Sequence, residues 1–304
     1  MKYPEAINKV YVLVKDLHDV GEKASYIPEL AYMDEDKFGI HISTIGQIKS
    51  GFGDFKDKFS IQSISKVFSL CMAYGILGEA IWERVGVEPS GTAFNSLILL
   101  ETDNGIPRNP FINSGAMVIC DILISHFKHP KQDFLDYVRM LCDNQLLEYS
   151  ERIAESERKA GYRNIALCNF IKSFDNIKNE PEEVLDFYFN ICSLEMNCEE
   201  LSQSFIFLAN AGCKLSDKKV ILSKSKTKRI NALMQTCGFY DESGEFSFKV
   251  GLPGKSGVGG GIIAVHPKKY SIAVWSPRLN KKGNSYKGMR FLEEFTTLTK
   301  ASIF

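Results

Sequence analysis

The chain has no excess charge of either sign and no apolar run long enough to cross a bilayer. Its 304 residues carry 37 basic and 37 acidic side chains, so no overall field would attract nucleic acid or an anionic membrane. The most apolar segment, 67–78, is well short of the roughly 20 residues that a membrane span needs. The charged first 20 residues lack the apolar core of a secretory signal. We therefore expect a cytoplasmic protein that binds a small or zwitterionic ligand, without nucleic-acid or membrane partners.

Metal-binding and disulfide patterns are also missing. The five histidines and eight cysteines form no C-x-x-C, no H-E-x-x-H and no zinc-finger spacing. Because nothing indicates export to an oxidising compartment, the cysteines are expected to be reduced and to serve as small core residues. The sequence implies no metal and no cofactor.

What is present is a helical block between two groups of short strands. Apolar spacing predicts helices over 4–20 and 287–300 and nearly continuous helix from Ser63 to about Leu233. Strands are predicted at 30–33, 38–43, 47–49, 246–250, 262–266 and 270–275. If both strand groups share one sheet, the fold class is α/β (α+β). The antiparallel sheet domain would comprise 1–62 and 238–304, the helical domain would comprise 63–237, and the ligand would bind in the cleft between them.

The motif S-x-x-K at Ser63–Lys66 is typical of serine enzymes that use lysine as a base. Five other matches occur, but only this one follows a strand group and opens an apolar helix; the others start at Ser125, Ser156, Ser216, Ser223 and Ser225. On a helix the amine of Lys66 can reach the Ser63 hydroxyl one turn away. Lys66 must be neutral to act as a base, which requires burial or a second nearby cation, and Lys255 is the candidate cation.

Two further elements of that enzyme class are less distinct. Lys255-Ser256-Gly257 resembles K-T-G and begins a glycine-rich run, but Lys49-Ser50-Gly51 has the same pattern. S-D-N is absent, and its looser form Y-x-N fits both 162–164 and 188–190. The motifs alone leave the second catalytic group open.

Longer strings resemble the serine-dependent glutaminase family, in order, over nearly the whole chain. They are 26–31 (YIPELA), 59–66 (FSIQSISK), 109–116 (NPFINSGA), 237–240 (CGFY), 250–258 (VGLPGKSGV) and 275–277 (WSP). The resemblance implies a β-lactamase/DD-peptidase-like fold, hydrolysis of L-glutamine to glutamate and ammonia, and a homo-oligomer, either a dimer or a tetramer.

The resemblance also implies roles for individual residues. Ser63 would be the nucleophile and Lys66 its base, Tyr240 would carry a proton, and the backbone N–H groups of Ser63 and Val258 would form an oxyanion hole. Lys255 completes the catalytic set. Contacts with the substrate would come from Tyr26, Asn113, Glu157, Asn164 and Tyr188, together with Ser63, Tyr240 and Val258.

Two other functions fit the same motifs. A β-lactam-recognising serine hydrolase shares the first motif and the fold, but it would normally need export. A non-catalytic sensor of glutamine or glutamate would have no use for Ser63 beside Lys66.

Overall fold

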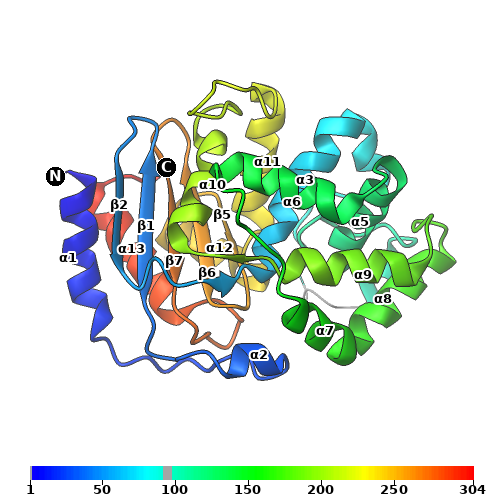
Figure 1. Ribbon diagram of the computed structural model, residues 1–304, viewed down its shortest axis with the longest axis horizontal. Coiled ribbons are helices and arrows are strands. Elements are labelled where there is room, and N and C mark those ends of the chain that lie inside the picture. Colours follow the sequence, from blue (N-terminus) through cyan, green and yellow to red (C-terminus); the bar gives the residue numbers. More distant parts are fainter. Residues whose placement is uncertain (1, 92–97) are drawn as a thin grey trace.

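The computed structural model describes residues 2–91 and 98–304 and shows one antiparallel sheet built from both ends of the chain (Figure 1). The strand order is β2-β1-β7-β6-β5, with β1 (Gly39–Thr44), β2 (Lys49–Gly53), β5 (Gly254–Ser256), β6 (Gly261–His266) and β7 (Tyr270–Trp275). Neighbouring strands are antiparallel throughout. The α/β class with an antiparallel sheet, as predicted, is confirmed.

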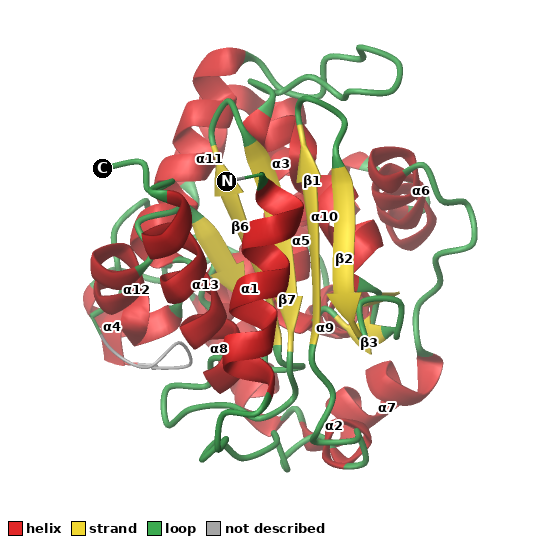
Figure 2. Ribbon diagram, turned by 90° about the vertical axis from the view of Figure 1, so that its left-hand side faces the viewer, coloured by secondary structure: helices red, strands yellow, loops and turns green. Residues whose placement is uncertain are grey.

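Helices from the two ends of the chain cover one face of the sheet. In Figure 2, α1 (Tyr3–Lys15) and α13 (Tyr286–Thr299) lie in front of the strands. Alternate residues of β6 and β7, such as Ile262 and Ile272, join their apolar side chains in one core. The intervening residues, such as Ile263 and Ala273, belong to a larger core on the opposite face. Because both faces are buried, these strands are nearly continuous apolar runs.

The middle of the chain is helical, as expected. It contains α3 (Ser65–Leu77), α4 (Ile98–Thr102), α5 (Asn113–His126), α6 (Pro130–Cys142), α7 (Glu151–Ala160), α8 (Tyr162–Ser173), α9 (Pro181–Cys192), α10 (Cys198–Ala209) and α11 (Lys224–Cys237). A small second sheet pairs β3 (Phe59–Ser60) with β4 (Glu195–Met196). The larger core runs through these helices to the inner face of the main sheet. Because this core is shared by the helices and the sheet, it marks no boundary between them, and the domain boundaries predicted at residues 62 and 237 stay a prediction.

A polar seam joins α10 to the inner face of the sheet. His41 Nδ1 lies 2.6 Å from Ser202 Oγ, and Ser43 Oγ lies 3.0 Å from the same hydroxyl. Ser271 Oγ donates to the Ser202 carbonyl at 2.5 Å. Burial lowers the pKa of His41 to about 4, so its imidazole is neutral at pH 7.

Four predicted elements differ in the structure. The strand predicted at 47–49 begins only at the last of these residues, as β2. Residues 30–33 are not a strand, because Pro28 opens the short helix α2 (Pro28–Ala31). Residues 246–250 belong to α12 (Ser243–Lys249) and its end, where Phe246 and Val250 are buried one helical turn apart and Phe248 is 89% exposed. The first helix ends at Lys15 rather than near Gly21, and beyond it Leu17 and Val20 are exposed.

One helical stretch, Gln62–Glu83, is long and apolar enough to cross a membrane, but most of it is buried inside the protein. It begins with the 3₁₀ turn η1 (Gln62–Ile64), continues through α3 and ends with η2 (Gly78–Glu83). This agrees with the core helix expected at 67–78. All eight cysteines are free thiols.

Candidate active site

Ser63 lies at the junction between the small sheet and the buried helix α3. It occupies the middle of η1, directly after β3, and is 8% exposed. The preceding residue, Gln62, has a φ of 49°, in the left-handed region that side chains rarely adopt. Such strain persists only where the surroundings enforce it, and it is common at functional sites.

Lys66 is fully buried in the first turn of α3. Its Nζ donates to Asn113 Oδ1 at 2.6 Å and to the Phe111 carbonyl at 3.4 Å. Burial lowers the pKa of Lys66 to about 8. Asn113 in turn donates from Nδ2 to Asn164 Oδ1 at 3.0 Å, so α3, α5 and α8 are linked through one amide.

Lys255 and Tyr240 come from the other end of the chain. Ser256 N–H donates to the Gly238 carbonyl at 3.2 Å, which holds the segment that enters η3 (Tyr240–Glu242) against the edge strand β5. Lys255 Nζ donates to the Ser256 carbonyl at 2.6 Å and lies 4.5 Å from the centroid of the Tyr240 ring. Tyr240, like Gln62, has a left-handed φ, here 57°.

Both side chains are electrostatically perturbed. Burial raises the pKa of Tyr240 to about 12, against hydrogen bonds with Ser63 and Ser256 that lower it. Burial lowers the pKa of Lys255 well below its ordinary value, and the charge of Lys66 adds to this shift. The sequence suggested that the charge of Lys255 would lower the pKa of Lys66. In the structure the charge of Lys66 lowers the pKa of Lys255, whereas burial lowers the pKa of Lys66.

The glycine run after Lys255 places Val258 beside Ser63. A Cβ on Gly257 would lie 2.4 Å from the Ile61 carbonyl oxygen, and one on Gly259 would lie 2.2 Å from that of Ser60. Only glycine allows the turn to approach this backbone so closely. Trp275 Nε1 donates to the Gly259 carbonyl at 3.0 Å and anchors the turn. Within the described residues, the amide N–H groups of Ser63 and Val258 donate no hydrogen bond to another backbone group.

Glu157 is a nearly buried carboxyl on α7. Gln62 Nε2 donates to its Oε1 at 2.9 Å. Burial raises the pKa of Glu157 to about 7, although the Gln62 hydrogen bond and the charge of Lys66 act to lower it. The carboxyl can therefore change its protonation state near neutral pH.

These groups surround one cavity of about 500 Å³. Its lining contains Tyr26, Gln62, Ser63, Asn113, Glu157, Ala160, Gly161, Tyr162, Arg163, Asn164, Tyr188, Cys192, Tyr240 and Val258. Every predicted substrate contact is in this set, while Lys66 and Lys255 are fully buried and absent from the lining. Both named residues of the first Y-x-N pattern, Tyr162 and Asn164, line the cavity. Of the second pattern, Tyr188 lines the cavity, but Asn190 donates to the Asp186 carbonyl within α9.

Sequence reasoning assigned no role to several lining residues, among them Gln62 and Cys192. Gln62 belongs to the string around Ser63, and its place directly before the nucleophile was the available signal. Cys192 was expected only as a core thiol, and burial indeed raises its pKa to about 12. Among the described residues, no group of three His, Cys, Asp or Glu side chains could hold a metal ion.

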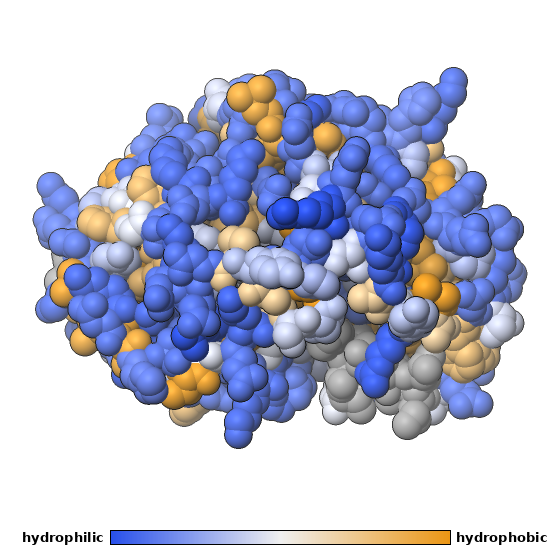
Figure 3. Space-filling model, turned by 60° about the horizontal axis from the view of Figure 1, so that its bottom comes forward, coloured by the Kyte–Doolittle hydropathy of each residue, from blue (hydrophilic) through white to orange (hydrophobic). Residues whose placement is uncertain are grey.

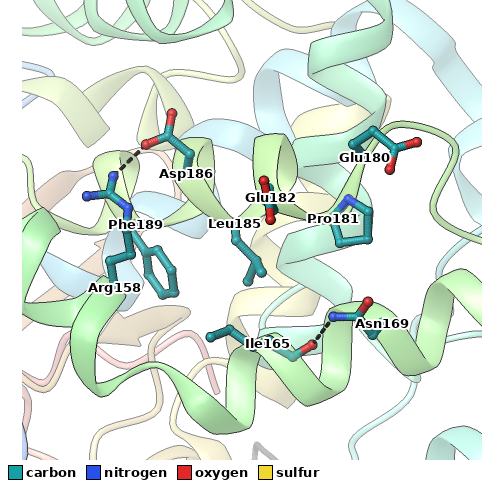
Figure 4. Close-up of a pocket in the computed structure, with 9 residues that line it drawn as sticks. All are labelled: Arg158, Ile165, Asn169, Glu180, Pro181, Glu182, Leu185, Asp186 and Phe189. Atoms are coloured by element: carbon teal, nitrogen blue, oxygen red, sulfur yellow. Dashed lines mark hydrogen bonds and ion pairs between the residues drawn. The ribbon is translucent and has the colours of Figure 1, made fainter.

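A second cavity, of about 780 Å³, lies between α7, α8 and α9 (Figure 4). Arg158 pairs there with Asp186, and Asn169 donates to the Ile165 carbonyl. None of the predicted site residues lines it. The face of the molecule that carries α2 and α7 is mostly hydrophilic, with only scattered apolar groups (Figure 3).

Known proteins resemble the chain over nearly its whole length. A family model described as glutaminase matches residues 21–304. The glutaminase of Christiangramia forsetii is 57% identical over 284 residues, 93% of each chain, and that of Saccharophagus degradans is 53% identical over 302 residues, 99% of this chain and 98% of the other.

Solved structures show the same fold. One described as a probable glutaminase, YbaS, superimposes with a TM-score of 0.95 at 31% identity, covering 99% of this chain and 98% of that one. Mglu in its glutamate form gives 0.93 at 28% identity, covering 100% of this chain and 70% of that one. The predicted β-lactamase-like fold is thus confirmed, and the chain belongs to the glutaminase family.

Proposed function

We propose that this glutaminase hydrolyses the side-chain amide of L-glutamine through an ester on Ser63. The observation that carries the proposal is one cavity lined by Ser63, Tyr240, Val258 and the carboxyl-bearing Glu157, with Lys66 buried one helical turn from Ser63. The family relationship supports the reaction, and the geometry supports the assignment of the steps to these residues.

In the first step neutral Lys66 takes the proton of Ser63 as Oγ attacks the amide carbon. Because the pKa of Lys66 is about 8, roughly a tenth of the lysine is neutral at pH 7. The N–H groups of Ser63 and Val258 donate to the oxyanion that forms.

Tyr240 then protonates the departing nitrogen, which leaves as ammonia. Burial keeps its phenol protonated at neutral pH, so it can act as a donor, and the proton held by Lys66 restores it. Water hydrolyses the glutamyl ester with the same groups acting in reverse. No step of this route needs a cofactor.

Recognition of free glutamine requires partners for both the α-ammonium and the α-carboxylate, because neither charge can be buried alone. Glu157 supplies the negative charge. Asn113, Asn164, Tyr26 and Tyr188 line the same cavity and can donate hydrogen bonds to the carboxylate.

The test is ammonia release from millimolar L-glutamine by the wild type and Ser63→Ala, with L-asparagine as the control substrate. We expect glutamine-selective release that falls at least ~10³-fold in the variant. Turnover of a chromogenic β-lactam without glutamine turnover would favour the β-lactam hydrolase, and glutamine binding without ammonia would favour the sensor.

The dimer or tetramer implied by the resemblance is also part of this proposal. Light scattering on the eluted peak of a size-exclusion column measures the molar mass directly. A mass equal to one chain across the working concentration range would contradict it.

A further inference from the structure

Gln62 connects the nucleophile segment to the carboxyl group in the cavity. Its side chain is 3% exposed, and its Nε2 donates both to Ser60 Oγ at 3.0 Å and to Glu157 Oε1 at 2.9 Å. Ser60 Oγ donates its own proton to the Cys192 carbonyl at 2.9 Å. The chain of donors therefore fixes which end of the Gln62 amide faces Glu157, since an ionised carboxylate can only accept.

The backbone and its neighbours hold this side chain in place. The Gln62 carbonyl accepts from Ser65 Oγ at 2.7 Å, and the residue itself is kept at a φ of 49°. Its Cβ lies 3.3 Å from the position that a Cβ on Gly257 would take. A side chain fixed from several directions can orient its partner, because little freedom remains to absorb a shift.

Glu157 depends on this contact. Around it in the cavity are the phenols of Tyr26 and Tyr188, the Cys192 thiol and, behind the wall, the amine of Lys66. Within the described part of the chain, Gln62 makes the one side-chain hydrogen bond to the Glu157 carboxyl. A buried carboxylate without a donor would be neutralised, and a neutral carboxyl cannot pair with an ammonium group.

We propose that Gln62 is a positioning residue that holds Glu157 for the substrate's α-ammonium group, and thereby makes a free α-amino group a requirement for turnover. This inference rests on the proposed function. It assigns Gln62 to substrate selection through Glu157, although its neighbour in sequence is Ser63.

The test compares two amides in the wild type and in Gln62→Met, which keeps the length of the side chain but removes its donor. The amides are L-glutamine and 4-carbamoylbutanoate, which is glutamine without the α-amino group. For glutamine we expect KM to rise ~10-fold or more, as for the loss of a hydrogen bond to a charged group, while kcat changes less than ~3-fold. For 4-carbamoylbutanoate kcat/KM should stay within ~2-fold, so the preference for glutamine collapses.

A pH series gives an independent readout. Because the Gln62 hydrogen bond lowers the pKa of Glu157, the rise of KM on acidification should begin at higher pH in Gln62→Met than in the wild type. Gln132→Met is the matched control, since Gln132 donates to the Asp136 carboxylate at 2.8 Å on the exposed face of α6. It should change neither KM nor its pH dependence.

Gln62→Asn is the second variant, because asparagine tolerates a left-handed φ while its shorter side chain cannot reach Glu157. It should reproduce the rise in KM if Gln62→Met fails to fold. An unchanged KM for glutamine, or an equal loss of kcat with both amides, would overturn the inference and place Gln62 with Ser63 instead. Failure of the wild type to release ammonia would instead refute the proposed function.

Discussion

At the residue scale, a buried lysine one helical turn from a serine is the feature on which the proposed chemistry depends. Lys66 is enclosed by Asn113 and the Phe111 carbonyl, which accept from its amine without carrying a charge. Burial therefore remains the main influence on its protonation. An exposed lysine at the same position would be almost wholly protonated at pH 7.

We predict that kcat/KM for glutamine rises as the pH is increased through about 8. In the proposed mechanism the neutral lysine is the reactive form, so activity should be lost as the pH falls below the pKa of Lys66. Glu157, with a pKa of about 7, should act in the same direction, because in the proposed mechanism its ionised form binds the ammonium group. Initial rates at low substrate concentration between pH 6 and 9.5 measure the profile.

Lys66→Met should lower kcat by ~10²- to 10⁴-fold at every pH and remove the upper step of the profile. Lys214→Met is the control, since Lys214 is also buried but is paired with Asp143 and Asp217. It should keep the profile of the wild type. A profile that is flat between pH 7 and 9 in the wild type would contradict the role of Lys66.

Apart from Ser63 and Lys66, the candidate site residues could be predicted from the sequence only with the resemblance. The S-x-x-K pattern and its helix single out Ser63 and Lys66, whereas Glu157 has nothing in its charged surroundings that distinguishes it from a surface residue. Its burial depends on Gln62 and on helices far away in the chain. Such contacts leave no local pattern, which is also why Gln62 and Cys192 were missed.

At the element scale, the glycine turn between β5 and β6 has little room for any added side chain. We predict that Gly259→Ala lowers kcat by ~10²-fold or more, because its Cβ would lie 2.2 Å from the Ser60 carbonyl oxygen and push the Val258 amide away from Ser63. Steady-state kinetics and a thermal melt on the same sample separate loss of geometry from loss of fold.

Gly244→Ala is the matched control. Gly244 lies in α12, where an added methyl group would have no atom within 4 Å and the φ is not positive. Alanine should leave kcat unchanged and stabilise the helix by up to ~1 kcal/mol. Equal effects of the two substitutions on kcat would show that the turn does not need its close approach.

The elements themselves were predictable where one spacing dominated. The apolar runs of β6, β7 and α13 fit one pattern, and the structure has them within a residue of the predicted bounds. Residues 246–250 fit two patterns, since Phe246 and Val250 are compatible with alternation and also with one helical turn. Stacking of Phe246 on Phe239, with ring centroids 3.6 Å apart, accompanies the helix. This contact is invisible in a short window of sequence.

At the scale of the whole molecule, the polar seam under the sheet should make the fold sensitive to acid. The pKa of His41 is about 4 in the folded protein and about 6.5 when unfolded, so the unfolded chain binds more protons between these values. Its contribution is complete above pH 6.5 and is lost as the pH falls towards 4, by up to about 3 kcal/mol. Glu157 opposes it over pH 4.5 to 7, because its raised pKa makes the folded state take up protons.

We therefore predict that His41→Gln is less stable than the wild type at pH 7.5 and that the difference shrinks at pH 5. Urea unfolding at the two pH values measures both differences, and comparison of the two proteins cancels the effect of Glu157. His129→Gln, at an exposed position, should follow the wild type. A constant difference between pH 7.5 and pH 5 would show that His41 is not the acid-sensitive group.

The continuous core also bears on how substrate and products travel. Phe59 stacks on Trp275, with ring centroids 4.9 Å apart, and the core around this pair extends from the helices to the sheet. Separating the helices from the sheet would therefore expose apolar side chains to water, which costs free energy. Tyr26, by contrast, is 57% exposed at the cavity, and in the segment that follows it Ile27 and Leu30 pack with Val258 in a small separate cluster. Glutamine should therefore enter, and ammonia and glutamate should leave, past Tyr26 and the segment that follows it, without separation of the helices from the sheet.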